Sequence, residues 1–243
     1  MSKCSYRREC SCASSIDIMC AEPLGFDLVI FDCDGVLADS EVLACRCLAD
    51  VLGRHGAGVT LDVVFERFLG RSVAAVADHF RANGRVMPAD FTEELWATVQ
   101  SSFARSLQPM PGIEKMLRHL DMRACVASSS DRERLEFTLE VIGLSRHFAG
   151  RTFTAQMVKN GKPAPDLFLY AAASMGAVPA KTLVVEDTVS GVAAGKAAGM
   201  AVWGFTGGSH CIGRDVPALL ARAGADRIFD RMADFWPVAA ERR

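Results

Sequence analysis

The stretch FDLVIFDCDGVLADSE, residues 26–41, decides the fold of this chain. It opens with an unbroken apolar run, LVIF at 28–31, which ends abruptly in the polar turn sequence DCDG at 32–35. Unbroken apolar runs suit strands that are buried on both faces, as in parallel sheets. Because Asp and Gly favour turns, the DCDG sequence alone could be no more than the exit from a strand.

Two more apolar runs of the same design follow. Residues 124–127 lead into three serines, and residues 183–185 lead into an acidic pair. Helical patterns lie after these runs and between them, at 132–142, 166–175 and 188–198. This alternation of strand and helix predicts an α/β fold with a doubly wound, Rossmann-like parallel sheet core.

One segment interrupts the alternation. Between about residues 40 and 107 the apolar spacing is helical throughout, with helices expected at 61–69, 73–82 and 88–107 and a first helix capped by Ser40. We therefore expect a small, mobile helical cap domain at 40–108, inserted into a core domain that comprises 24–39 and 109–243. Its two connections, at 38–41 and 108–112, would be the hinges.

The predicted helix from Thr188 carries Gly191, Gly195 and Gly199 at a spacing of four residues, which places all three on one face. A membrane-dimer interpretation is weak, because the segment is short and contains Lys196. We expect this bare face to lie close against the sheet.

The first 23 residues form a leader rich in Ser and Cys, which we expect to be disordered and outside the folded unit, or to precede a start at Met19. Its cysteines follow the spacing C-x5-C-x-C-x7-C, a poor match to zinc sites, which bring ligands in close pairs. The odd total of 9 cysteines, with no secretory signal, argues against a disulfide framework and for a cytoplasmic protein. The four leader cysteines are Cys4, Cys10, Cys12 and Cys20.

Composition excludes several classes of protein. Hydrophobic residues make up 50% and charged residues 23%, as in globular proteins with a substantial core. The formal net charge is −2 without a long basic run, which argues against nucleic acid or an anionic membrane as a partner. No apolar stretch approaches the roughly 18 residues of a membrane span.

Polar side chains follow three of the predicted strands. Because the carboxyl ends of parallel strands share one edge of a sheet, these side chains should meet there. Four carboxylates in one cleft would repel each other unless cations held them, and such a cluster suits Mg²⁺. Lys162 in GKPAPD would add positive charge. The residues at this edge are Asp32, Asp34, Ser128, Glu186 and Asp187.

Each of these residues also has a simpler interpretation. Ser128 could be a helix N-cap, alone or in addition to a role in the site. Lys162 could be a solvated loop lysine, and Glu186 with Asp187 could favour the start of the next helix through its dipole. His210, in the loop sequence GGSH, could approach the cleft or be a surface or packing residue.

Taken together, the motifs resemble those of the haloacid dehalogenase-like (HAD) hydrolases. FDCDGVL followed by DSE resembles the first family motif, Ser128 the second, GKPAPD the third and VVEDTVSGVAAGKAAGM the fourth. The four occur in order, and the resemblance covers about residues 26–206. The helical insert after the first motif resembles the C1-type cap of β-phosphoglucomutase-like proteins and sugar-phosphate phosphatases.

This resemblance implies a catalytic site. Asp32 would be the nucleophile, forming an aspartyl-phosphate, and Asp34 the general acid and base. The phosphate-binding residues would be Ser128, Ser129 and Lys162. The Mg²⁺ ligands would be Asp32, Asp34 through its backbone carbonyl, Glu186 and Asp187.

The resemblance also separates reaction classes. True dehalogenases lack an acid equivalent to Asp34, and phosphonate hydrolases usually have a small residue there together with a cap lysine. β-Phosphoglucomutases typically carry a His twelve residues after the nucleophile, where this chain has Ala44, and an Arg three residues after a glycine near the hinge, where it has Val73. Arg71 is nearby but shifted.

These departures favour a phosphatase over a mutase. We expect the substrate to be a small phosphorylated metabolite, a sugar phosphate or a sugar-acid phosphate, and the protein to be a monomer or weak homodimer. A β-phosphoglucomutase-like phosphomutase is the alternative. A non-catalytic protein that binds a phosphorylated metabolite is less favoured, because such relatives usually lack a site residue and none is missing here.

Overall fold

The three apolar runs form neighbouring strands of one sheet in the computed structural model, which describes residues 25–236. The leader at 1–23, with its zinc and disulfide alternatives, therefore lies outside the described residues. The strands are β1 Leu28–Phe31, β2 Arg123–Ser128, β3 Thr152–Thr154, β4 Thr182–Glu186, β5 Ala201–Phe205 and β6 Arg227–Phe229. All pair in parallel in the order β3-β2-β1-β4-β5-β6, which confirms the doubly wound α/β fold.

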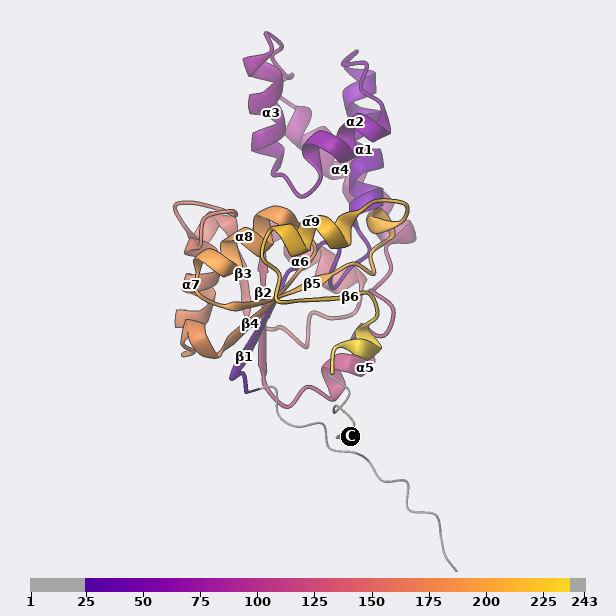
Figure 1. Ribbon diagram of the computed structural model, residues 1–243. Helices are drawn as coiled ribbons and strands as arrows, with labels where there is room; N and C mark the ends of the chain where they lie inside the picture. Colours follow the sequence, from indigo (N-terminus) through magenta and orange to yellow (C-terminus); the bar gives the residue numbers. More distant parts are fainter. Residues whose placement is uncertain (1–24, 237–243) are drawn as a thin grey trace, which may run out of the picture.

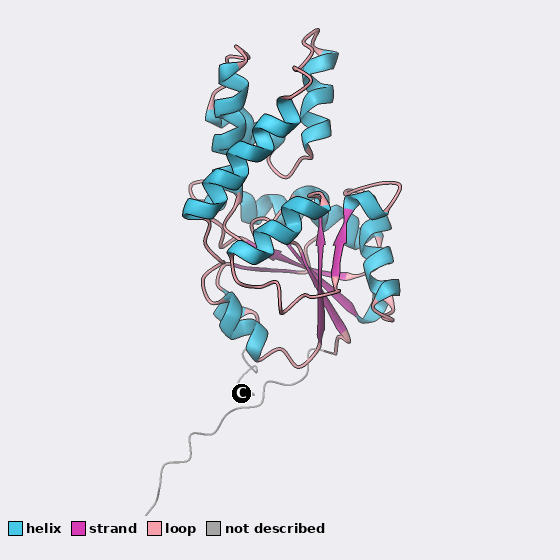
Figure 2. Ribbon diagram, turned by 180° about the vertical axis from the view of Figure 1, so that it is seen from behind, coloured by secondary structure: helices cyan, strands magenta, loops and turns pink. Residues whose placement is uncertain are grey.

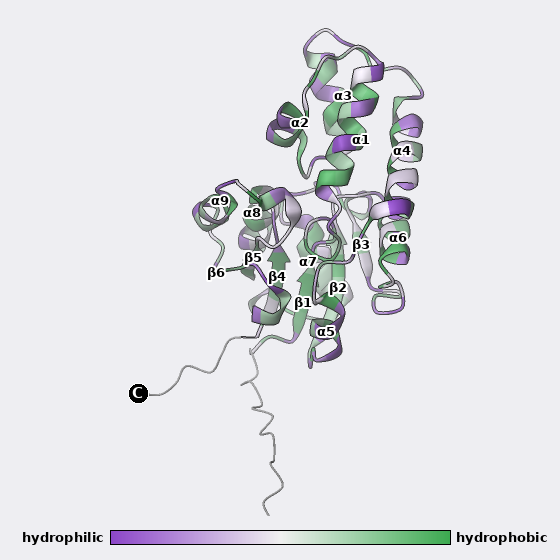
Figure 3. Ribbon diagram, turned by 90° about the vertical axis from the view of Figure 1, so that its right-hand side faces the viewer, coloured by the Kyte–Doolittle hydropathy of each residue, from purple (hydrophilic) through white to green (hydrophobic). Residues whose placement is uncertain are grey.

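Helices cover both faces of the sheet (Figure 2). Leu28 and Ile30 of β1 pack with α7 (Asp166–Ser174), α8 (Val189–Ala197) and α9 (Val216–Arg222) in one buried cluster. Val29 and Phe31 point to the other face, toward α5 (Ile113–Arg118) and α6 (Arg132–Val141). Burial on both faces explains why the central strands read as continuous apolar runs, which appear green in Figure 3.

Four helices fill the segment between the first strand and α5: α1 Glu41–Arg54, α2 Leu61–Phe68, α3 Val73–Ala82 and α4 Phe91–Ser106. They project from the side of the core toward which β1 runs (Figure 1). Residues 41–106 contain no strand, as the helical spacing predicts. None of the helices within residues 25–236 is long and apolar enough to cross a membrane.

The two connections between this helical block and the core run side by side. Ala38 and Pro109 form an antiparallel bridge. The Asp39 amide donates to the Gln108 carbonyl at 3.1 Å, and the Met110 amide donates to the Leu37 carbonyl at 2.8 Å. Both proposed hinges therefore belong to one short paired segment.

Two of the three glycines at the fourth motif pack as expected. A Cβ built on Gly195 would lie 2.6 Å from Val202 Cγ2, so only a bare helix face fits against β5 there. A Cβ on Gly191 would lie 1.9 Å from the Glu186 carboxyl group. The expectation for Gly199 is wrong: it follows the end of α8 in a left-handed conformation, with φ +72°, and nothing lies near its Cβ position.

Candidate active site

The strand order reverses between β1 and β4, and the acidic residues lie at the ends of these two strands. Asp32 and Asp34 follow β1, Glu186 ends β4, and all three are buried. A cavity of about 400 Å³ opens above them, lined by core residues below and by residues of α1–α4 above. Such a switch point is where open parallel sheets bind their ligands.

Lys162 lies at the floor of this cavity, between two carboxylates. Its Nζ is 2.6 Å from Asp32 Oδ1, 2.6 Å from Glu186 Oε1 and 3.0 Å from the Ala127 carbonyl oxygen. Burial lowers the pKa of Lys162, but Asp32 and Glu186 outweigh that effect and raise it above its ordinary value. The ammonium is therefore charged. Because it lies between two carboxylates and not in solvent, the interpretation of Lys162 as a solvated loop lysine is wrong.

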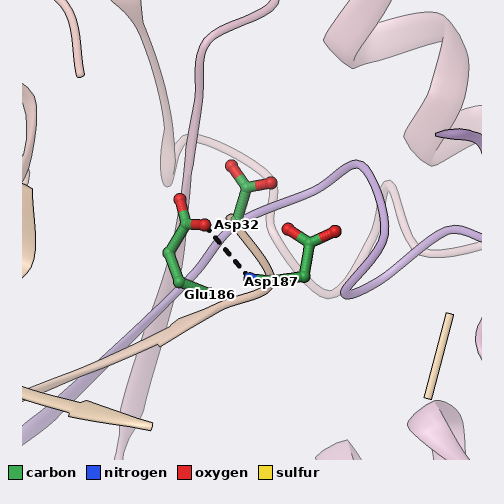
Figure 4. Close-up of side chains that lie close together, drawn as sticks. All are labelled: Asp32, Glu186 and Asp187. Carbon is green, nitrogen blue, oxygen red and sulfur yellow. Dashed lines mark hydrogen bonds between the residues drawn. The ribbon is translucent and has the colours of Figure 1, made fainter. Parts of the chain in front are cut away.

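Glu186 has hydrogen-bond donors on both carboxylate oxygens. Oε1 accepts from Lys162, and Oε2 accepts from the amides of Asp187 and Thr188, at 3.1 and 3.0 Å, and from Thr188 Oγ1 at 2.9 Å. Figure 4 shows the Glu186–Asp187 bond as a dashed line. Glu186 thus fixes Lys162 and the start of α8.

Asp187 is in the opposite situation. Neither of its carboxylate oxygens has a hydrogen-bond partner among residues 25–236, although both are buried. Burial, followed by the nearby charge of Glu186, raises its pKa well above the ordinary value. A buried carboxylate without donors is costly unless a cation compensates it.

The acidic residues fit a divalent cation. One oxygen each of Asp32, Glu186 and Asp187 lies within 4.8 Å of the others, and the three side chains converge in Figure 4. Burial raises the pKa of Asp32 well above its ordinary value, as it does for Asp187. Oxygen-only donors of this kind suit Mg²⁺. The Asp34 carboxylate is outside this group, consistent with a role for its backbone carbonyl alone.

The Asp34 carboxylate points to three donors instead. Ser40 Oγ donates to Oδ1 at 2.6 Å, Ser130 Oγ to Oδ2 at 2.9 Å, and Arg134 Nη2 to Oδ1 at 3.1 Å. Burial would raise the pKa of Asp34, but Arg134 and then the two hydroxyl groups lower it overall. The prediction for Ser40 is corrected here: it occupies the N-cap position of α1, but its hydroxyl makes no cap bond and goes to Asp34.

The serines after β2 line the same cavity. Ser128 is buried, and its Oγ accepts from the Ser130 amide at 3.0 Å, which leaves its own hydroxyl proton free to donate. Ser129 lies beside it in the cavity wall. The N-cap interpretation of Ser128 is wrong, because α6 is capped by Asp131, which accepts from the Arg134 amide at 2.8 Å.

Sequence reasoning missed Arg134 and Ser130 as partners of Asp34, and Glu41 as a wall of the cavity. Glu41 is buried in the first turn of α1, and burial, then Asp34 and Asp187, raise its pKa to about 8. His210 does approach the cleft: its Nε2 lies 3.1 Å from Asp187 Oδ2. The feature of the sequence that pointed to this position of His210 was its place in the loop sequence GGSH.

A paired carboxylate and lysine at the switch point of a parallel sheet, beneath a helical insert, are typical of an α/β enzyme that binds its substrate at the ends of its strands. The chain belongs to the haloacid dehalogenase-like hydrolase family, whose model matches residues 26–199. That match covers most of the described chain and contains every site residue discussed above except His210.

Three known proteins illustrate the similarity. The chain is 27% identical to the 6-phosphogluconate phosphatase of Escherichia coli, over 76% of this chain and 84% of the relative. It is 30% identical to the fructose-1-phosphate phosphatase of the same organism, over 71% and 92% of the two chains. A solved HAD family hydrolase from Deinococcus radiodurans, with bound phosphate and sodium, superposes with a TM-score of 0.68 at 32% identity and covers 86% of this chain and 93% of that one.

Proposed function

We propose that this protein is a Mg²⁺-dependent phosphatase that hydrolyses a small phosphorylated metabolite, a sugar phosphate or sugar-acid phosphate, through an aspartyl-phosphate on Asp32. The observation that carries the proposal is the contact of the buried Asp32 with Lys162. A second buried aspartate, Asp34, follows Asp32 by two residues. The similarity to phosphatases of 6-phosphogluconate and fructose 1-phosphate supports the substrate class.

The first half-reaction transfers the phosphoryl group to the protein. A carboxylate oxygen of Asp32 bonds to phosphorus while the bond between phosphorus and the leaving oxygen breaks. Asp34, which must be protonated in the substrate complex although Arg134 lowers its pKa in the free protein, gives its proton to that oxygen, so the leaving group departs as a neutral alcohol. In the second half-reaction Asp34 takes a proton from water, whose oxygen attacks phosphorus, frees Asp32 and releases inorganic phosphate.

The surrounding residues stabilise the transferred group. The Lys162 ammonium and the free hydroxyl proton of Ser128, which line the cavity with Ser129, would donate to the phosphoryl oxygens. A bound Mg²⁺ would supply further positive charge to those oxygens. Asp32, Asp187, the Asp34 carbonyl and Glu186 would hold the ion, with Glu186 the most engaged by other contacts.

A phosphatase fits the cavity better than a mutase. Ala44 and Val73 both line the cavity, at the positions where a β-phosphoglucomutase would offer a His and an Arg. A mutase must hold the second phosphate of its bisphosphate intermediate with fixed cations. Arg71 also lines the cavity and is the one observation that keeps a β-phosphoglucomutase-like phosphomutase as the second candidate.

The remaining expectations belong to the same proposal. The partner is a small phosphorylated metabolite rather than nucleic acid or a membrane, and the protein acts in the cytoplasm as a monomer or weak homodimer. A non-catalytic binding role is disfavoured, because the nucleophile, acid, lysine and acidic pair are all present at one cavity.

The test is phosphate release from 6-phosphogluconate, fructose 1-phosphate, glucose 6-phosphate and nucleotides with Mg²⁺, beside Asp32→Asn. We expect Asp32→Asn to lower kcat by at least about 10³-fold, because the attacking oxygen is lost, in a protein that still folds. EDTA should abolish release and Mg²⁺ restore it. Appreciable turnover by Asp32→Asn would remove Asp32 as nucleophile, and conversion of β-glucose 1-phosphate to glucose 6-phosphate would favour the mutase.

A further inference from the structure

The loop after β5 places a buried histidine against the one acidic residue of the site that lacks hydrogen-bond donors. His210 lies in the short helix Ser209–Cys211 and is only 2% exposed. Its Nε2 is 3.1 Å from Asp187 Oδ2 and 3.2 Å from Cys211 Sγ. Its other ring nitrogen has no partner among residues 25–236, so Nε2 is the atom that meets a charged group.

Two glycines make room for this contact. A Cβ on Gly35 would lie 1.8 Å from Asp187 Oδ2 and 3.0 Å from His210 Cε1, and Gly35 itself has φ +80°. A Cβ on Gly208 would lie 2.6 Å from the same His210 carbon. Ring and carboxylate thus share a space that any larger residue at either glycine would close.

The histidine loop is also anchored independently of any ligand. Both the amide and the Oγ of Ser209 donate to Asp39 Oδ1, at 2.9 and 2.8 Å. A Cβ on Gly207 would lie 2.2 Å from the Asp230 carbonyl oxygen, so the loop also lies directly against the chain after β6. The position of His210 is therefore fixed from both sides.

We infer that His210 is a positioning residue for the metal site, which holds Asp187 in the orientation that binds the cation. This inference rests on the Mg²⁺ site of the proposed function. The imidazole nitrogen close to Oδ2 leaves the other oxygen of Asp187 for the cation. Without that contact the buried carboxylate has nothing to select one rotamer, since neither oxygen has a hydrogen-bond partner within residues 25–236. Outer residues that orient a ligand in this way typically change metal affinity 10–100-fold when removed.

His210 is not itself a ligand in this arrangement. The acidic cluster that could hold an ion comprises Asp32, Glu186 and Asp187, without the histidine. His210 also lies outside the residues matched by the family model, which end at 199. Its effect on the cation would act through Asp187 alone.

The experiment is calorimetric titration of the whole protein with Mg²⁺ alone, with unfolding temperature in EDTA as a second readout. His210→Phe keeps a ring but removes the nitrogen that contacts Asp187, and we expect about 10–100-fold weaker binding. His210→Gln restores an N–H group and should bind within about threefold of the native protein. Gly208→Ala keeps the histidine but displaces it and should also bind more weakly, whereas Gly53→Ala, a matched control with open space at its Cβ, should not.

The outcomes separate the two proposals. Native Mg²⁺ affinity in His210→Phe would overturn the positioning role while leaving the proposed function intact. Equal losses in His210→Phe and His210→Gln, with equally lowered unfolding temperatures, would show a packing role and overturn it as well. If His210→Phe fails to fold, the comparison of Gly208→Ala with Gly53→Ala decides the question. No Mg²⁺ binding by the native protein would overturn the metal site and this inference together.

Discussion

At the scale of single residues, Lys162 explains how so many acids can be buried in one place. Its side chain is 3% exposed and its ammonium contacts Asp32 and Glu186 at the same distance, 2.6 Å. Phe168 lies under the ammonium, with its ring centroid 4.9 Å from Nζ. Removing one member of such a group leaves an uncompensated buried charge, which costs far more than the pair itself contributes.

Lys162→Met should therefore lower the free energy of unfolding by about 3–5 kcal/mol, in addition to suppressing catalysis. Urea unfolding in EDTA measures this loss without a cation to compensate. Adding Glu186→Gln to the variant removes one of the two stranded charges and should restore part of the stability. A Lys162→Met protein as stable as the native one would mean that the ammonium does not compensate these acids.

Much of the candidate site could be predicted from the sequence because its residues end strands. Asp32 and Glu186 each close an apolar run, and parallel strands bring such ends together. Arg134 could not be found this way, because it meets Asp34 across 100 residues from the first turn of a helix. No periodicity marks a contact that depends on how a helix docks beside a strand end.

At the scale of elements, α8 shows how packing overrides helix propensity. Gly191 and Gly195 lie inside the helix, where alanine would ordinarily be favoured by about 1 kcal/mol each. Both are buried against neighbours that leave no room for a Cβ. Because Gly191 lies directly against the Glu186 carboxyl group, its lack of a side chain leaves room for that carboxylate in the site.

Gly191→Ala should therefore destabilise the protein and disturb the site, opposite to the effect of alanine on an isolated helix. The added carbon must displace the Glu186 carboxyl group, at an expected cost of about 1–3 kcal/mol for an overpacked position. Gly53→Ala in α1 is the control: it meets nothing within 4 Å and should be neutral or stabilising by about 0.5–1 kcal/mol. Chemical denaturation of both variants measures the difference, and a stabilised Gly191→Ala would contradict the packing argument.

Asp226 links three elements at the edge of the sheet. Lys196 of α8 donates to both of its oxygens, at 2.7 and 2.8 Å, and the Val202 amide of β5 donates to Oδ2 at 2.7 Å. Burial is the largest single effect and opposes ionisation, but the bonds from Lys196 and Val202 and the charge of Lys196 together lower the pKa of Asp226 below its ordinary value. The folded state therefore favours the charged carboxylate.

Because the folded pKa lies below the unfolded one, the stability from Asp226 is present above the ordinary pKa of 3.8 and is lost as the pH falls through the folded value. Asp226→Asn should lower the free energy of unfolding by about 1 kcal/mol at pH 7, a modest figure because the side chain is partly exposed. The gap to the native protein should narrow in urea titrations below about pH 4. A gap that stays constant with pH would assign the effect to packing.

The short edge strands mark where element prediction from sequence fails. β3 is Thr-Phe-Thr and β6 is Arg-Ile-Phe, three residues each, without the apolar run that identified the central strands. At the edge of the sheet a strand is buried less completely, so its sequence carries less of the pattern. The helices of the insert were predictable because their apolar spacing repeats over several turns; α3 has the expected bounds, 73–82.

At the scale of the whole molecule, the helical insert contacts the core at several places, and two of these lead to Asp34. One is the paired hinge, whose Ser40 donates to Asp34. The other is the contact of α4 with α6, which lies directly below α4 in Figure 3. There Phe103 lies 5.6 Å from the guanidinium of Arg134, which also donates to Asp34. A movement of the insert relative to the core would change two of the three donors to the proposed acid, Ser40 and Arg134, at once.

Trp96 of α4 should report such a movement. Its indole N–H donates to Glu133 of α6 at 3.0 Å and its ring packs edge-on against Phe137 at 5.7 Å. If ligand binding draws the insert toward the core, adding Mg²⁺ with inorganic phosphate should change the native tryptophan emission as this contact is rearranged.

Trp96→Phe isolates that signal. It keeps an aromatic ring but loses the hydrogen bond to Glu133, worth about 1 kcal/mol, so kcat/KM should fall by less than about tenfold. The emission change with Mg²⁺ and phosphate should disappear, because the other two tryptophans, Trp203 and Trp236, both pack against Phe235 in the core and do not lie at the moving surface. An unchanged response in Trp96→Phe would place the rearrangement inside the core, and the two hinges would then hold the insert fixed while substrate enters and leaves.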